Sequence, residues 1–120
     1  MGRSSQRKGA GGERELAKLL KGYGCDVRRG GALSVGREPD LVGLPGIHVE
    51  VKRAERLNLP EAVKQSRQDS DRFNDGLPAV FHRRNRGEWL VTMPLDAWMI
   101  IYQKSQAITA TGDAGDSKDS

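Results

Sequence analysis

Two acidic residues and a lysine near the middle of the chain have the types and the spacing of a metal site. Asp40 and Glu50 lie on either side of the turn sequence Leu-Pro-Gly at residues 44–46, and Lys52 follows Glu50 by two positions. Two runs of β-type residues around such a turn are typical of a hairpin. If the loop spans residues 44–46, Asp40 pairs with Glu50 across the two strands.

Side chains alternate across a strand, so this hairpin has two different faces. One face carries the apolar residues Leu41, Ile47, Val49 and Val51, and the other carries Asp40, His48, Glu50 and Lys52. We therefore expect the first face to belong to the core and the second to carry the chemistry.

Two carboxylates that oppose each other on one face repel. Opposed Cβ atoms lie about 5 Å apart, and two like charges at that distance repel by roughly 3 kcal/mol at an effective dielectric of about 20. A cation or a proton between them removes this cost, and oxygen ligands suit Mg²⁺ or Mn²⁺. Lys52 reaches the same face and could orient a water or a phosphate oxygen. The pattern favours phosphodiester hydrolysis, whereas a hairpin with a solvated face, in which Glu38 pairs with Lys52, is the ordinary alternative.

Length and composition restrict the class of protein. The chain has 120 residues, of which 36% are hydrophobic, enough for one domain with a modest two-layer core. No apolar run approaches 18 residues and no secretory leader is evident, so we expect a soluble, intracellular, cytoplasmic protein with no membrane partner. Cys25 is alone, which argues against disulfides and structural zinc. A net charge of +4 fits a polyanion such as DNA, although many basic domains bind none.

Hydrophobic periodicity and turn residues predict an αβββαββα order of elements. The expected elements are a helix over 13–23, a strand over 25–29, the hairpin, a helix over 59–73, strands over 78–82 and 88–93, and a last helix from residue 94. This order indicates an α/β fold, a mixed β-sheet flanked by helices. We expect residues 1–12 to form a flexible basic arm, 13–104 the domain and 105–120 a disordered tail. The apolar width of the last helix predicts packing against the sheet, with Trp98 as a core or dimer anchor.

The first helix offers a further carboxylate. Glu13 lies about 60° from the centre of the apolar stripe of that helix, and Glu15 lies about 100° away on the other side. Glu13 is therefore the better candidate for an inward-facing acid. A first-turn glutamate favoured by the helix dipole is the alternative.

Several basic residues could contact a phosphate backbone. They are Arg7 and Lys8 in the arm, Arg28 and Arg29 after the first helix, and Arg83, Arg84 and Arg86 in the turn between the last two strands. Ser34, in a glycine-rich connection, could also touch phosphate. A frayed terminus explains the arm equally well, and a plain loop explains Arg28, Arg29 and Ser34 equally well. A turn tip with several arginines is usually only solvated.

The order of these motifs resembles the PD-(D/E)xK nuclease superfamily. A helix glutamate (Glu13), a Pro-Asp pair (Pro39-Asp40) and the Glu-x-Lys motif (Glu50-Val51-Lys52) follow one another on the expected elements. Within this superfamily, the first part of the chain is similar to the opening of archaeal-type Holliday junction resolvases and related phage proteins. The similarity lies in Arg7-Lys8-Gly9, then Glu13-Arg14-Glu15-Leu16, then Arg28. The resemblance covers roughly residues 7 to 100.

The resemblance implies a restriction-endonuclease-like fold and a metal-dependent endonuclease, a hydrolase of DNA recombination and DNA repair that resolves Holliday junctions. It implies one or two Mg²⁺ ions, with Mn²⁺ as a substitute, held by Glu13, Asp40, Glu50 and the Val51 carbonyl. Lys52 would then lie beside the attacking water, and Ser34 is the nearest match to a serine that contributes in the family. A phage-encoded protein in a bacterial host is one possible origin.

Junction resolution needs two symmetric cuts, which implies a homodimer because one chain of this size holds one active site. Two alternatives stay open. One is a nuclease of the same fold that acts on flaps, nicks or duplex DNA. The other is a basic DNA-binding module without catalysis, whose binding would be salt-sensitive and independent of divalent ions.

Overall fold

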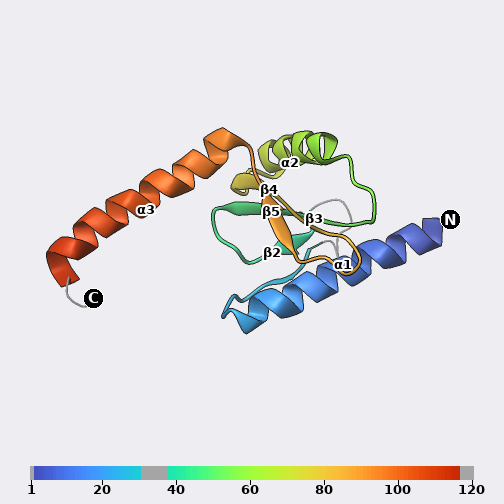
Figure 1. The fold of residues 1–120 in the computed structure, drawn as a ribbon. Helices are drawn as coiled ribbons and strands as arrows, with labels where there is room; N and C mark the ends of the chain where they lie inside the picture. The colour runs from blue at the N-terminus through green and yellow to red at the C-terminus, as the bar shows by residue number, and fades with distance from the viewer. Residues whose placement is uncertain (1, 31–37, 117–120) are drawn as a thin grey trace.

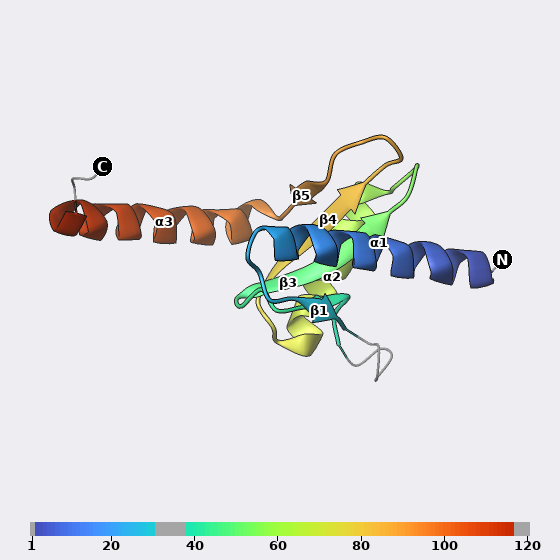
Figure 2. The same cartoon turned by 90° about the horizontal axis from the view of Figure 1, so that it is seen from below.

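The computed structural model describes residues 2–30 and 38–116 of the chain. Its elements are α1 (Gly2–Gly22), β1 (Arg28–Arg29), β2 (Leu41–Val42), β3 (Ile47–Arg53), α2 (Leu59–Phe73), β4 (Leu77–Arg83), β5 (Leu90–Thr92) and α3 (Leu95–Asp116). This is the predicted αβββαββα order, and the α/β class is confirmed. In Figure 1 the sheet lies between α1 below and α2 above, and Figure 2 shows α1 crossing the face opposite α2.

The five strands form one mixed sheet in the order β1-β2-β3-β4-β5. β3 and β4 are parallel and are connected through α2, whereas the other neighbouring pairs are antiparallel. In the hairpin, Leu41 is the register partner of Val49, as the sequence predicts. The Ile47 amide donates to the Leu44 carbonyl at 3.0 Å and closes the turn, where Gly46 has a φ of 87° that favours glycine.

The hydrophobic core lies between α1 and the sheet. Leu16 and Ala17 of α1 pack with Leu41, Val49 and Phe81, and all five are buried. Since the apolar face of the hairpin is part of this cluster, the predicted division into two faces holds on this side.

The second helix covers the opposite face of the sheet. Asn58 caps α2 by accepting from the Glu61 amide at 3.2 Å, and a proline stands in the first turn. Ala62, Ser66 and Ser70 are the buried residues of α2. On the other face of the hairpin, His48 and Glu50 are therefore buried beneath α2, whereas Asp40 and Lys52 stay partly exposed.

The ends of the long helices differ from the prediction. The segment expected as a flexible arm is helical from Gly2, and the segment expected as a disordered tail continues α3 as far as Asp116. Each extension lengthens a helix that already exists, so it adds hydrogen bonds without a new nucleation cost. The glycines and serines that suggested coil are tolerated there at a modest cost in helix propensity.

The expectation that the last helix packs against the sheet is wrong. Figures 1 and 2 show α3 leaving the sheet at β5 and projecting away from the rest of the domain. Its exposed large apolar residues are Leu95, Trp98, Ile100, Ile101, Tyr102 and Ile108. The physical reason is that α1 and α2 already cover the central strands, so the uncovered part of the sheet next to α3 is β5, whose Leu90 and Val91 are exposed. In the described part of the chain, no helix has the length and hydropathy to span a membrane.

Candidate active site

Asp40 lies immediately before β2, in an environment that disfavours its charge. Burial raises the pKa of Asp40 from 3.8 to about 6, and the negative charges of Glu50 and Glu13 act in the same direction. The Val51 amide, which donates to Asp40 Oδ2 at 2.8 Å, and the Lys52 ammonium partly offset this rise. The predicted acids are thus close enough to repel one another.

Glu50, on β3, is only 6% exposed and accepts from a neighbour on the same strand face. His48 Nε2 lies 3.1 Å from Glu50 Oε1, and His48 Nδ1 lies 2.9 and 3.0 Å from the two oxygens of Asp75. Burial opposes protonation of His48, but hydrogen bonds to Glu50 and Asp75 and their charges outweigh it, so the pKa of His48 is raised above 6.5.

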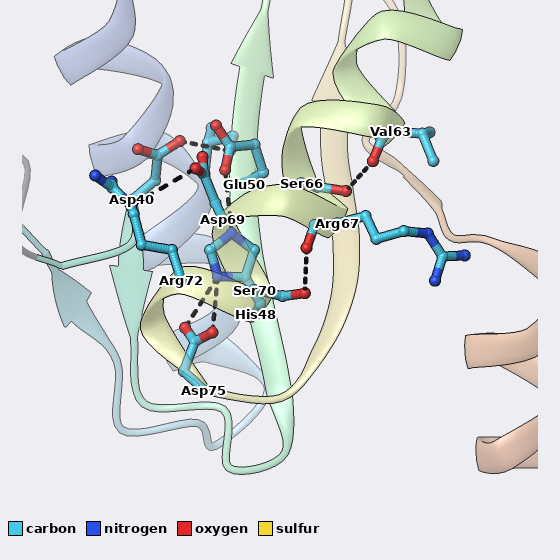
Figure 3. A network of polar contacts seen from close by, with 11 residues as sticks. Asp40, His48, Glu50, Val63, Ser66, Arg67, Asp69, Ser70, Arg72 and Asp75 are labelled. Atoms are coloured by element: carbon cyan, nitrogen blue, oxygen red, sulfur yellow. Dashed lines mark hydrogen bonds and ion pairs between the residues drawn. The ribbon is translucent and has the colours of Figure 1, made fainter.

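A third carboxylate reaches the site from α2. Among the described residues, one group of potential metal ligands has all its donor atoms within 4.8 Å of one another, and it consists of His48, Glu50 and Asp69. Figure 3 shows the carboxylates of Asp40, Glu50 and Asp69 gathered on one side of the His48 ring. Arg72 of the same helix lies 4.0 Å from Asp69.

Glu13 lies at the edge of this cluster. Its side chain is 17% exposed and accepts from Arg29 Nε at 3.0 Å. α1 approaches β3 closely here, since a Cβ placed on Gly12 would lie 2.9 Å from the Arg53 Cβ. Glu13 is the more buried of the two helix acids, as the helical wheel predicts, whereas Glu15 is 41% exposed and binds Arg53. The carboxylate oxygens of Glu13, Asp40 and Glu50 do not all lie within 4.8 Å of one another.

The chain matches a family model over residues 4–109, and that model describes the archaeal Holliday junction resolvase, Hjc. The chain belongs to the archaeal Holliday junction resolvase family.

A solved relative agrees with this assignment to the Hjc family. The structure of Archaeoglobus fulgidus Hjc, described as a Holliday junction resolvase from an archaeal hyperthermophile, is similar with a TM-score of 0.54 and 25% sequence identity. The similarity covers 72% of each chain. No curated protein matches the sequence. The resemblance and the fold class inferred from the motifs are confirmed.

The basic residues expected at DNA lie in different settings in this Hjc-family chain. Arg28 is paired with Glu38 at 2.9 Å, Arg29 with Glu13, and Arg83 with Glu15. Arg84 and Arg86 are exposed in the turn between β4 and β5. Ser34 lies outside the described residues, as do the side chains of Arg7 and Lys8.

The interpretation of the sequence missed Asp69 and Asp75 and gave no role to His48. A signal existed for two of them. Asp69 lies three residues after Ser66 and seven after Ala62, which places all three on one helix face. His48 alternates with Glu50 on one strand face. Asp75 follows the end of α2, where no periodicity points to it.

The donor set of this Hjc-family site fits a divalent cation. It consists of the carboxylate oxygens of Asp40, Glu50 and Asp69, which suit Mg²⁺ or Mn²⁺, while both ring nitrogens of His48 already contact carboxylates. Burial and the charges of Glu50 and Glu13 raise the pKa of Asp40, so its ionised form is unfavourable in the folded protein. A bound cation would remove this cost.

Proposed function

We propose that this chain is a divalent-metal-dependent endonuclease that cleaves four-way DNA junctions. Its membership of the Hjc family supports the substrate class. The observation that carries the metal dependence is the environment of Asp40, whose carboxyl is buried among like charges at the motif position of the superfamily.

In this proposal Asp40 and Glu50 hold Mg²⁺ or Mn²⁺, with Asp69 completing the set from α2. Glu13, whose charge acts on Asp40, and the Val51 carbonyl are further candidate ligands. When bound, the cation supplies an activated water and stabilises charge on the phosphoryl oxygens.

The remaining residues orient the carboxylates or supply positive charge for the phosphate. The Val51 amide fixes one oxygen of Asp40 at 2.8 Å, so the other oxygen keeps a defined direction. The Lys52 side chain, half-buried beside these acids, places a positive charge where a phosphate oxygen would arrive. By analogy with the superfamily, the products would carry a 5′ phosphate.

The exposed Arg84 and Arg86 are proposed to contact the DNA backbone. Neither is withdrawn from solvent, and they stand together at the tip of the β4–β5 turn. Ionic contacts of this kind contribute affinity that falls with salt but no sequence preference.

We also propose that the enzyme acts as a homodimer. Two cuts on opposite strands need two active sites, and each chain carries one. The apolar surface of α3 and β5 supports this, because Trp98 and Tyr102 stack with centroids 5.3 Å apart and yet are 48% and 44% exposed. Exposed large apolar side chains that gather on one surface are typical of an interaction site.

The direct test is incubation of a labelled mobile four-way junction with and without Mg²⁺, read on a denaturing gel. We expect cleavage with Mg²⁺ only, and at least about 100-fold slower cleavage for Asp40→Asn and Glu50→Gln, the loss typical of an essential electrostatic group. Asp71→Asn, on the exposed side of α2, is the matched control and should cleave normally.

Each contrary result identifies one of the alternatives. Equal cleavage of linear duplex would indicate a nuclease of the same fold with a different substrate. Salt-sensitive binding without cleavage in Mg²⁺ or Mn²⁺ would indicate a DNA-binding module. Full activity of either site variant would remove the site assignment.

A further inference from the structure

His48 is fully buried and lies between two carboxylates. Its exposed fraction is 0%, and its two ring nitrogens contact Asp75 on one side and Glu50 on the other. A buried imidazole is costly unless its nitrogens are hydrogen-bonded. Both ring nitrogens of His48 have such a partner, so the buried histidine is stably held within the site.

The chemistry of the partners sets the direction of these hydrogen bonds. An ionised carboxylate can only accept, so the ring nitrogen that faces it must donate. Nδ1 of His48 faces the carboxylate of Asp75, and Nε2 faces that of Glu50. The ring therefore links the two acids rigidly.

The plane of the ring is fixed by packing. Phe73 of α2 stacks on His48 with an interplanar angle of 17° and centroids 6.1 Å apart. The imidazole therefore cannot turn away from Glu50 without losing this contact.

Asp75 is itself held by the turn that follows α2. Asn74 ends the helix with a φ of 51°, and Gly76 has a φ of 133°. The Leu77 amide then donates to the Gly46 carbonyl at 2.8 Å, which ties this turn to the hairpin loop. Asp75 thus stands on backbone that is fixed on both sides.

We propose that His48 and Asp75 are a positioning pair that orients Glu50 for the divalent cation. His48 Nε2 contacts Glu50 Oε1 at 3.1 Å, which restrains a flexible side chain that lies beside Asp40 and Asp69 in Figure 3. The inference rests on the proposed function for its catalytic meaning, but its effect on cation affinity can be measured without DNA. Loss of such an outer partner typically weakens metal affinity by about 10- to 100-fold.

Two substitutions of His48 separate positioning from packing. His48→Gln carries an amide nitrogen near the place of Nε2 and can still donate to Glu50. His48→Asn carries one near the place of Nδ1, so it can face Asp75 but cannot reach Glu50. Both remove the ring and its stacking, so a purely structural role predicts similar losses.

The measurement is the Mn²⁺ dissociation constant from electron paramagnetic resonance of the full chain without DNA. We expect His48→Asn to bind Mn²⁺ about 10- to 100-fold more weakly than the wild type and His48→Gln to recover most of that loss. Cleavage should need a correspondingly higher Mg²⁺ concentration in His48→Asn, with junction affinity unchanged. Wild-type Mn²⁺ affinity in a folded His48→Asn variant, or equal losses in both variants, would overturn the proposal.

Asp75 supplies a second test if the His48 variants do not fold, because its side chain is 25% exposed. Asp75→Leu removes the acceptor and should weaken Mn²⁺ binding, whereas Asp75→Asn keeps an oxygen that accepts from Nδ1 and should bind more tightly than Asp75→Leu. Asp71→Asn is the control. Unchanged affinity in Asp75→Leu would refute the pair.

The outcomes distinguish this inference from the proposed function. A wild-type protein that binds Mn²⁺ but does not cleave junctions would contradict the proposed function. The Mn²⁺ affinities of the His48 and Asp75 variants would still decide whether these two residues position Glu50. A wild type that cleaves, with variants that bind Mn²⁺ normally, would contradict the pair alone.

Discussion

Replacing Asp40 by asparagine should stabilise the metal-free protein while abolishing its activity. The pKa of Asp40 rises from 3.8 to about 6, first because of burial and then because of the charge of Glu50. At about 1.36 kcal/mol per pKa unit, an ionised Asp40 costs the folded state about 3 kcal/mol above pH 6. Asparagine removes this charge, and its side-chain oxygen can still accept from the Val51 amide.

The realised gain should be smaller than this bound. Asp40 keeps some contact with solvent, and the asparagine amide must itself be accommodated in the site. We expect Asp40→Asn to raise the free energy of unfolding by about 1–2 kcal/mol near neutral pH, an uncommon direction for a substitution in a buried site.

The pH dependence follows from the sign of the shift. Because the folded pKa lies above the unfolded one, the wild type has its full relative stability below about pH 3.8 and loses it as the pH rises through about 6. The advantage of Asp40→Asn should therefore be about a third of its maximum near pH 4.5 and reach that maximum above pH 7.

The assay is urea unfolding of both proteins in EDTA at these two pH values, repeated with saturating Mg²⁺ or Mn²⁺. A cation that binds only the folded wild type stabilises it by about 2.7 kcal/mol at 100 times the dissociation constant, so the order of stability should reverse. Asp71→Asn should show neither effect. If Asp40→Asn is less stable than the wild type in EDTA at neutral pH, or if its advantage does not depend on pH, the electrostatic account of the site is wrong.

Three further predictions concern the surroundings of the site. Gly12→Val should destabilise the protein by more than about 1 kcal/mol in thermal unfolding, since the new side chain meets the β3 residue that α1 approaches, whereas Gly11→Ala, with open space around it, should not. Replacing Arg84 and Arg86 together by alanine should weaken junction binding and make the plot of log affinity against log salt shallower by about 1.8, as expected for two lost phosphate contacts; an unchanged slope would exclude them from the interface. Trp98→Glu should convert a dimer to a monomer in light scattering without lowering the unfolding temperature of the monomer, and a wild type that is monomeric at all concentrations would contradict the dimer.

The local features of this chain follow from its sequence, because each depends on residues near one another. Alternation and a Pro-Gly turn predicted the hairpin and its register of Leu41 with Val49. Hydrophobic periodicity and turn residues predicted α2 over residues 59–73, the range that the helix has. The register in turn placed Asp40 next to Glu50, whose charge acts on the pKa of Asp40.

Tertiary structure alone decided which separate elements meet. Asp75 reaches His48 because the turn after α2 is tied to the hairpin loop, a contact between residues 27 positions apart. Asp69 joins the acids because α2 is laid over β3, which no single helix period specifies. α3 projects from the domain because α1 and α2 already cover the central strands of the sheet. A sequence pattern records the apolar character of a helix but not the competition for the surface that it could bury.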